Sequence, residues 1–230
     1  MTQPAALIVG AGPGLSAAIA RACLKAGMTV ALAARNTAKL TDLAGATGAQ
    51  TFECDAADPG SVRTLFEDVD RRLGSPELVV FNASYRTRGP VAELDPAEVA
   101  KTLQISAYAG FLVGQQAALR MLPRGQGSIL FTGASASVKG YAHSAPFAMG
   151  KFALRGLAQS MARELGPKGI HVAHFVIDGA IRRDDGSRPS RGPDSQLAPD
   201  AIAEAYLFAH RQPRSAWTWE IELRPWDETF

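Results

Sequence analysis

Short apolar and β-branched runs alternate with longer amphipathic segments along almost the whole of this chain. This alternation is typical of βαβ units, in which a helix connects two parallel strands and covers one face of their sheet. A sheet covered in this way is buried on both faces. The pattern therefore predicts an α/β fold with a doubly wound, parallel, seven-stranded sheet and helices on both of its faces.

Seven strands and six helices are expected. The strands are placed at Ala5–Val9, Thr29–Ala33, Thr51–Cys54, Leu78–Phe81, Ser128–Thr132, His171–Ile177 and Thr218–Leu223. The helices are placed at Pro13–Ala26, Thr37–Ala44, Ser61–Leu73, Pro96–Met121, Ala145–Leu165 and Pro199–His210. The segment Arg182–Gln196 is too polar to pack and is expected to be a flexible loop. No linker divides the 230 residues, so we expect one domain spanning residues 1–230.

The bulk properties exclude several classes of protein. The chain has 24 Lys and Arg against 22 Asp and Glu, a net charge of +2, which gives no reason to expect a nucleic-acid or membrane surface. Cys23 and Cys54 lie far apart without the spacing of a metal site, and no disulfide framework is indicated. Ala5–Val9 is too short for the core of a signal peptide. These features predict a cytoplasmic protein without a metal.

A glycine-rich turn, Gly10-Ala11-Gly12-Pro13-Gly14-Leu15-Ser16, follows the first expected strand and opens the first expected helix. Backbone N–H groups at such a helix start bind anions, so the turn predicts a phosphate site of the kind found in Rossmann folds. Its spacing is Gly-x-x-x-Gly, because Leu15 stands where a full G-x-G-x-x-G has its third glycine. A loop without a ligand is the alternative.

The end of the second strand bears on which dinucleotide would bind. An NAD site needs a carboxylate about 20 residues beyond the glycine turn, to bond the ribose 2′-hydroxyl. This chain has Ala34 there, followed by Arg35 and Asn36. A guanidinium pairs with a 2′-phosphate through two hydrogen bonds, so NADP(H) is favoured over NAD(H). The alternative is that Arg35 and Asn36 only flank a helix cap in solvent.

Several motifs together resemble the short-chain dehydrogenase/reductase family over most of the chain. They are the Gly10/Gly14 turn, Asp55 after the third strand, Asn82-Ala83-Ser84 after the fourth strand, and Lys151 on the fifth helix. The chain departs from the family at Ser16 and Ser84, where the family usually has glycine.

The resemblance implies where the cofactor lies. Asp55 would meet the edge of the adenine, the backbone of Asn82–Ser84 would pass beside the adenosine ribose, and the backbone near Ile181 would contact the nicotinamide. The alternative for Asp55 is an ordinary turn residue at a strand end. The expected cofactor-binding residues are Gly10, Gly12, Pro13, Gly14, Leu15, Arg35, Asn36, Asp55, Ala56, Asn82, Ala83, Ser84, Lys151, Gly179 and Ile181.

The resemblance also implies four catalytic positions, normally Asn, Ser, Tyr and Lys. This chain has Ser106, Ala134, Phe147 and Lys151 there. Phe147 and Lys151 are four residues apart, which puts them on one face of a helix, but phenylalanine has no proton to exchange with a substrate. Ser135 would restore a hydroxyl if the alignment slipped by one residue. Lys151 can still bond the ribose hydroxyls of the nicotinamide half of the cofactor.

Two functions remain open from the sequence. The first is an NADP(H)-dependent oxidoreductase that transfers hydride to or from a small carbonyl, alcohol or activated alkene, with the proton handled by a group other than Phe147. Other proton donors considered are Tyr108, Tyr141, His143 and Ser144. The second is a catalytically silent NADP(H)-binding protein with a regulatory or assembly role.

The expected partners are a small-molecule substrate and further copies of the chain. By resemblance, the loop Arg182–Gln196 would close over the substrate as a lid, although a solvated loop is the alternative. The resemblance also implies a homodimer or homotetramer built from the fourth and fifth helices. Those helices carry more apolar residues than one core-facing stripe needs, including Phe111, Leu112, Leu154 and Leu157.

Overall fold

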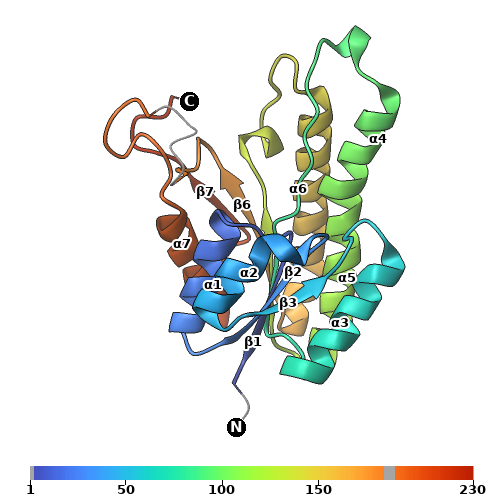
Figure 1. The fold of residues 1–230 in the computed structure, drawn as a ribbon, viewed down its shortest axis with the longest axis vertical. Helices are drawn as coiled ribbons and strands as arrows, with labels where there is room; N and C mark the ends of the chain where they lie inside the picture. Colours follow the sequence, from blue (N-terminus) through green and yellow to red (C-terminus); the bar gives the residue numbers. More distant parts are fainter. Residues whose placement is uncertain (1–2, 184–189, 230) are drawn as a thin grey trace.

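A seven-stranded parallel sheet forms the centre of the computed structural model, which describes residues 3–183 and 190–229 (Figure 1). Its strands are β1 Ala5–Val9, β2 Thr29–Ala34, β3 Gln50–Glu53, β4 Leu78–Phe81, β5 Ser128–Thr132, β6 His171–Ile177 and β7 Glu220–Leu223. The order is β3-β2-β1-β4-β5-β6-β7, so the chain winds outward from β1 to one edge and then crosses to β4 on the other side. The predicted doubly wound parallel sheet is confirmed.

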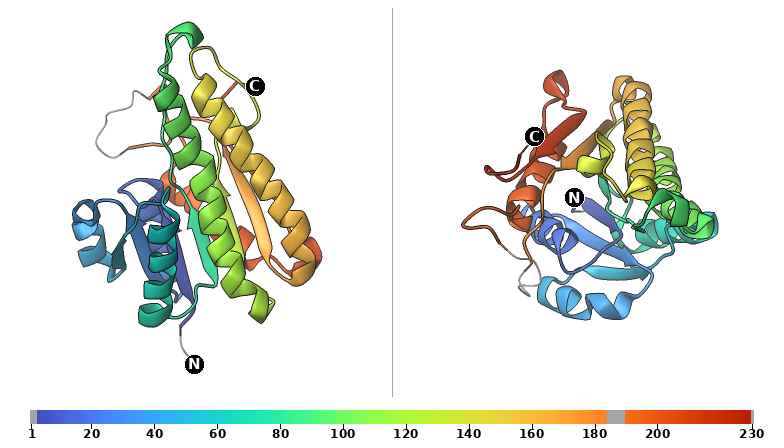
Figure 2. Two further views of the ribbon diagram at one scale, coloured as in Figure 1. Left: turned by 90° about the vertical axis from the view of Figure 1, so that its right-hand side faces the viewer. Right: turned by 90° about the horizontal axis from the view of Figure 1, so that it is seen from above.

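Helices cover both faces of the sheet. The α-helices of the described residues are α1 Leu15–Lys25, α2 Thr41–Thr47, α3 Pro59–Leu73, α4 Pro96–Leu103, α5 Ala109–Met121, α6 Ala145–Leu165 and α7 Pro199–Arg211. One buried cluster joins α1 and α7 to the sheet, and a second joins α3, α5 and α6 to its opposite face. Figure 2 shows α5 and α6 side by side. No helix in the described part of the chain has the length and hydropathy needed to cross a membrane.

Most predicted boundaries are close to the observed ones, but the expectation of one uninterrupted helix over Pro96–Met121 is wrong. A π-helical turn at Gln104–Tyr108 separates α4 from α5. Within it Ser106 is fully buried, and its hydroxyl donates to the carbonyl of Tyr85 and accepts from the N–H of Tyr85, both at 3.2 Å. A π turn adds one residue to the helical repeat and so turns a chosen side chain toward a neighbouring loop.

Smaller differences concern where elements begin. The first helix starts at Leu15 rather than Pro13, because Gly14 has the non-helical dihedral angles of a capping residue. The segment Thr37–Leu40 is a 3₁₀ turn that leads into α2. The last strand begins at Glu220, two residues later than expected.

The apolar residues expected at a subunit contact divide between the core and the surface. Leu112 and Leu154 are buried inside the protein, so they take no part in a surface. Leu157 is partly buried against the core. Phe111 is exposed on α5, as are Met149 and Phe152 on α6.

The loop after β6 is tied together at its two ends. Leu197 donates to the carbonyl of Ala180 at 2.9 Å, and Arg182 donates to the carbonyl of Leu197 at 2.8 Å. Residues 190–196 form turns without a helix or strand, as expected. Residues 184–189, which belong to the expected lid, lie outside the described residues.

Candidate functional site: a cavity at the switch point of the sheet

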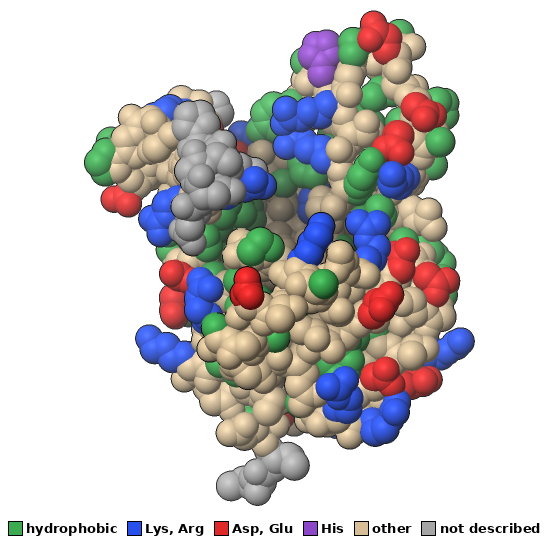
Figure 3. Space-filling model, viewed as in Figure 1, with side chains coloured by type: hydrophobic (Ala, Val, Ile, Leu, Met, Phe, Trp, Pro, Cys, Tyr) green, Lys and Arg blue, Asp and Glu red, His purple; other side chains and the backbone are tan. Residues whose placement is uncertain are grey.

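A cavity of about 350 Å³ lies at the carboxyl ends of β1, β2, β3 and β4. Here the chain reverses its direction of winding, which is where open α/β sheets bind ligands. Among the expected cofactor residues, those that line the cavity are Gly10, Gly12, Pro13, Arg35, Asn36, Asp55, Ala56, Ala83 and Ser84. Figure 3 shows a hollow at this end of the molecule with Lys and Arg side chains at its rim.

The glycine turn is held closed by contacts with the loop after β4. Gly10 has a φ of +83°, and a Cβ atom there would lie 2.3 Å from the backbone nitrogen of Ala83, so only glycine fits. Asn82 donates to the hydroxyl of Ser16 at 2.8 Å, and Ser16 donates to the carbonyl of Gly10 at 3.3 Å. Ser16 therefore bonds the turn to the end of the neighbouring strand β4.

The start of α1 is open toward the cavity. A Cβ atom at Gly12 or at Gly14 would meet no described atom within 4 Å. Within the described chain no side chain caps Gly14, and the first turn of α1 has no acidic residue. The first N–H groups of a helix lack partners inside the helix, and its dipole favours a negative charge. This end of the cavity fits a phosphate group.

The end of β2 places two cations at the cavity. Arg35 and Lys39 both line it and are exposed, and Ala34, the last residue of β2, leaves the position without a carboxylate. The Asn36 side chain accepts from the N–H of Ala38 at 3.1 Å and caps the following 3₁₀ turn. In a 3₁₀ turn, side chains three residues apart lie on the same side of the turn, so Lys39 lies on the side of Asn36, at the cavity. The sequence did not predict Lys39 as a site residue, because the direction of its side chain depends on the 3₁₀ geometry of this turn.

The turn that follows β3 lines the same cavity. Asp55 accepts from the N–H of Ala57 at 3.0 Å, and its own N–H donates to the hydroxyl of Ser61 at 3.0 Å. Asp55 is exposed and Ala56 is buried, and both line the cavity. Asp55 therefore both stabilises the turn and lines the cavity.

Two cations lie near the ring of Phe147. The Nζ of Lys151 is 5.8 Å from the centre of the Phe147 ring, as their spacing on one helix face predicted, and the Cζ of Arg86 is 4.5 Å from it. Lys151 is buried and donates to the carbonyl of Thr132 at 2.8 Å. Burial lowers the pKa of Lys151 to about 8. Arg86 belongs to the loop after β4, and no motif in the sequence marks it.

The other expected catalytic positions lie around this pair. Ala134 and Ser135 are half-buried just after β5, where a 3₁₀ turn over Ser135–Ser137 begins. The N–H of Ala134 donates to the hydroxyl of Ser137 at 3.2 Å. Ser106 packs against Gly150, where a Cβ atom would lie 3.0 Å from the Ser106 Cβ. The hydroxyl of Ser106 is thus bound to backbone rather than to Lys151.

The alternative proton donors are placed less favourably. Tyr141 and His143 are exposed in the loop before α6, and Ser144 is buried at the start of that helix. Tyr108 is exposed and stacks on Phe111, with ring centres 6.2 Å apart. Among the described contacts, none of these side chains reaches Lys151.

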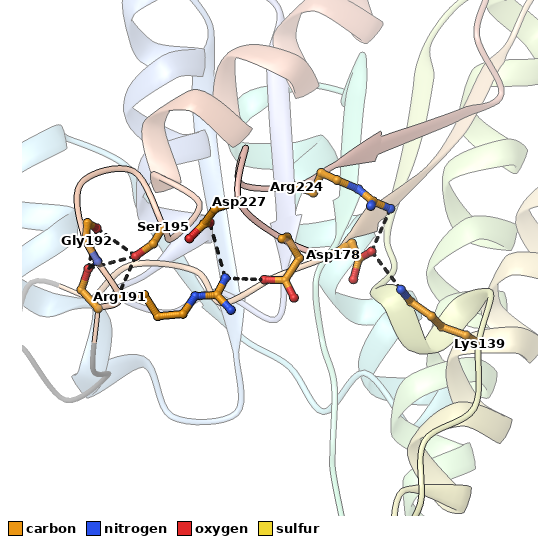
Figure 4. A network of polar contacts seen from close by, with 9 residues as sticks. Lys139, Asp178, Arg191, Gly192, Ser195, Arg224 and Asp227 are labelled. Atoms are coloured by element: carbon orange, nitrogen blue, oxygen red, sulfur yellow. Dashed lines mark hydrogen bonds and ion pairs between the residues drawn. The ribbon is translucent and has the colours of Figure 1, made fainter. Parts of the chain in front are cut away.

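The expected nicotinamide end is bounded by the C-terminal tail. Gly179 has a φ of +142°, and a Cβ atom there would lie 2.6 Å from Cδ of Pro225. Asp178 is buried and pairs with Lys139 at 3.2 Å and with Arg224 at 3.0 Å (Figure 4). In the same view Arg191 reaches the tail, 3.4 Å from Asp227. In the described residues, no group of three or more His, Cys, Asp or Glu side chains could hold a metal ion.

Comparison with known proteins gives the wider relationship. The sequence profile described as enoyl-(acyl carrier protein) reductase matches residues 10–208. The cyclic-di-GMP-binding biofilm dispersal mediator protein of Escherichia coli (strain K12) is 32% identical over 219 residues, covering 92% of this chain and 85% of that protein. D-threitol dehydrogenase of Mycolicibacterium smegmatis is 31% identical over 219 residues, covering 88% and 84%.

Solved structures agree with this relationship. A short-chain dehydrogenase from Rhodopseudomonas palustris has a TM-score of 0.83 and 36% sequence identity, with 97% of this chain and 99% of that chain covered. Further structures of the same fold were solved with NADP and with NADPH, at 24% and 22% identity, where the likeness shows the fold alone.

The strand order and the glycine turn at the switch point define a Rossmann-type α/β domain. The profile match and the relatives narrow this class further. The chain belongs to the short-chain dehydrogenase/reductase family, as its motifs predicted.

Proposed function

We propose that the protein is an NADP(H)-dependent oxidoreductase that acts on a small carbonyl, alcohol or activated alkene. The observation that carries the proposal is the cavity at the switch point, which has an open helix start at Gly12 and Gly14 and two cations, Arg35 and Lys39, at the end of β2. The helix start suits a pyrophosphate, and the cations suit a 2′-phosphate. When bound, NADP(H) supplies or accepts the hydride.

We assign the proton to Lys151. The phenyl ring of Phe147 cannot exchange one, whereas the ammonium of Lys151 lies on the same helix face. Burial brings the pKa of Lys151 to about 8, near the value that suits a general acid at neutral pH. In a reduction, the electron pair of the C=O π bond would move to oxygen as hydride reaches carbon, and Lys151 would deliver the proton to that oxygen. Lys151 would also donate a hydrogen bond to a ribose hydroxyl of the cofactor when it is bound.

A second candidate is an NADP(H)-binding protein without turnover, which has a regulatory or assembly role. Phe147 favours it, because the residue at this position normally exchanges the proton in the family. The Escherichia coli relative is likewise named for binding a nucleotide rather than for a reaction.

A turnover assay beside a binding titration separates the two candidates. We expect NADPH absorbance to fall with at least one member of a panel of aldehydes, ketones, keto sugars and activated alkenes, and Lys151→Met to lower that rate by about a hundredfold or more. Arg163→Met, on the exposed surface of the same helix, is the matched control. NADPH binding without turnover across the panel would favour the silent protein.

We further propose a cytoplasmic homodimer or homotetramer in which exposed apolar residues of α5 and α6, such as Phe111 and Phe152, meet a second copy. The loop Arg182–Gln196 is proposed to act as the substrate lid.

A further inference from the structure

Behind Lys151 lies a row of polar side chains that the proposed function does not use. Arg155 follows Lys151 by one turn of α6 and donates to both oxygens of Glu220 on β7, at 2.6 and 2.8 Å. An oxygen of Glu220 lies 3.1 Å from Nδ1 of His174 on β6. A carboxylate is an acceptor only, so this contact places the proton of a neutral His174 on Nδ1.

The second ring nitrogen of His174 is consequently an acceptor. The His174 side chain is 0% exposed, and its Nε2 has no hydrogen-bond partner among the described residues. Buried polar atoms nearly always have a partner, so an acceptor left open in this position calls for one.

Lys151 supplies a donor near this acceptor. A Cβ atom at Gly133 would lie 2.3 Å from the His174 Nε2, so the ring edge rests on the backbone of Gly133. The preceding residue, Thr132, accepts the hydrogen bond from the Lys151 Nζ at 2.8 Å. The open nitrogen and the ammonium therefore contact two consecutive residues, Gly133 and Thr132. An ammonium has three N–H donors, and Thr132 uses one of them.

Burial keeps His174 neutral. The groups that face its ring are Glu220 on β7 and Lys151 and Arg155 on α6. Burial lowers the pKa of His174 to about 4, against a smaller opposing effect of Glu220. At neutral pH the lone pair of Nε2 is therefore able to accept a hydrogen bond.

We propose that His174, fixed by Glu220, is a positioning residue for Lys151, whose ammonium it holds through one water molecule bridging Nζ and Nε2. A hydrogen bond to the charged form of a group raises the pKa of that group. His174 thus opposes the effect of burial on Lys151 and keeps the ammonium protonated. This role of Lys151 rests on the proposed function.

The test is a pH titration of Lys151 followed by NMR of protein labelled with ¹³C at the lysine ε-carbons, with the signal assigned by Lys151→Arg. It needs neither substrate nor turnover. His174→Leu removes the acceptor, and we expect the pKa of Lys151 to fall by about one unit. His174→Gln, which keeps a polar acceptor, should recover about half of that shift.

Tyr206→Phe is the matched control, because Tyr206 is buried on the opposite face of the sheet and bonds the side chain of the same Thr132. We expect it to leave the pKa of Lys151 unchanged. If His174→Leu does not fold, Glu220→Gln should lower the same pKa by a smaller amount. An unchanged Lys151 pKa in the His174 or Glu220 variant overturns the inference. A shifted pKa in a protein that never oxidises NADPH would instead contradict the proposed function alone.

Discussion

Phe147 is predicted to stand where the family has its proton-exchanging tyrosine, and both Arg86 and Lys151 lie near its ring. The ring face attracts cations, so Phe147 can hold both groups without a hydroxyl. The spacing of four residues was enough to predict that Phe147 and Lys151 share one face of the helix. The contact of Arg86 with Phe147 could not be predicted, because no sequence periodicity fixes the direction of a side chain in a loop.

Introducing the family's tyrosine and serine hydroxyls at Phe147 and Ala134 tests whether their loss limits the activity. We expect the double variant Phe147→Tyr with Ala134→Ser to raise NADPH-dependent carbonyl reduction by about a hundredfold, because a positioned acid contributes on that order. Steady-state kinetics on the substrate panel measures it. A fall in activity relative to wild type would mean that Phe147 takes part in a different mechanism.

Arg35 is the residue on which the cofactor preference depends. Replacing Arg35 by Ala should weaken NADPH binding by about tenfold to a hundredfold, since bonds to a charged group contribute roughly 1.5 to 3 kcal/mol, and should leave NADH binding nearly unchanged. Fluorescence titration measures both. Arg21→Ala is the matched control, because Arg21 pairs with Asp200 in an exposed ion pair outside the cavity. Equal losses for both dinucleotides would remove Arg35 from the 2′-phosphate site.

At the scale of elements, the junction of α6, β6 and β7 joins parts of the chain that the sequence does not link. The boundaries of α6 and β6 follow from their patterns, because capping and apolar runs are local signals. The contact of His174 with Glu220 spans 46 residues and depends on how β7 pairs with β6, which no local pattern specifies. The π turn at Gln104–Tyr108 was missed for a similar reason, since the buried bonds of Ser106 to Tyr85 favour it over a regular helix.

This junction makes stability depend on pH. The folded pKa of His174, about 4, lies below its ordinary value of 6.5, so between them the unfolded chain binds more protons and the folded state loses stability as pH falls. From about pH 7 to about pH 5 we expect a loss of about 2 kcal/mol from His174. Burial lowers the pKa of His171 and His210 as well, which adds a loss of the same sign.

Urea unfolding at both pH values measures this effect. His174→Gln should lose about 2 kcal/mol less than wild type over the interval, whereas His143→Gln, at an exposed position, should behave like wild type. Equal losses in wild type and His174→Gln would show that folding does not lower the pKa of His174.

At the scale of the molecule, the alternation of apolar and amphipathic segments was sufficient to predict the seven parallel strands and the helices on both faces. The sheet order then brings the Gly10 turn, Arg35, Asp55 and Ala83 to one cavity. The packing of Pro225 on Gly179 and the pairing of Arg191 with Asp227 could not be predicted, because they join the tail to a loop with little apolar content. They show that the C-terminal tail bounds the expected substrate end.

The central claim is that this cavity binds NADP(H) through the open start of α1 and the cations at the end of β2. Isothermal titration calorimetry of the wild-type protein with NADPH and with NADH tests it directly. We predict a measurable heat with NADPH and a Kd at least about tenfold lower than that for NADH. No heat with either dinucleotide at millimolar concentration, from protein that unfolds cooperatively, or tighter binding of NADH, would contradict the account.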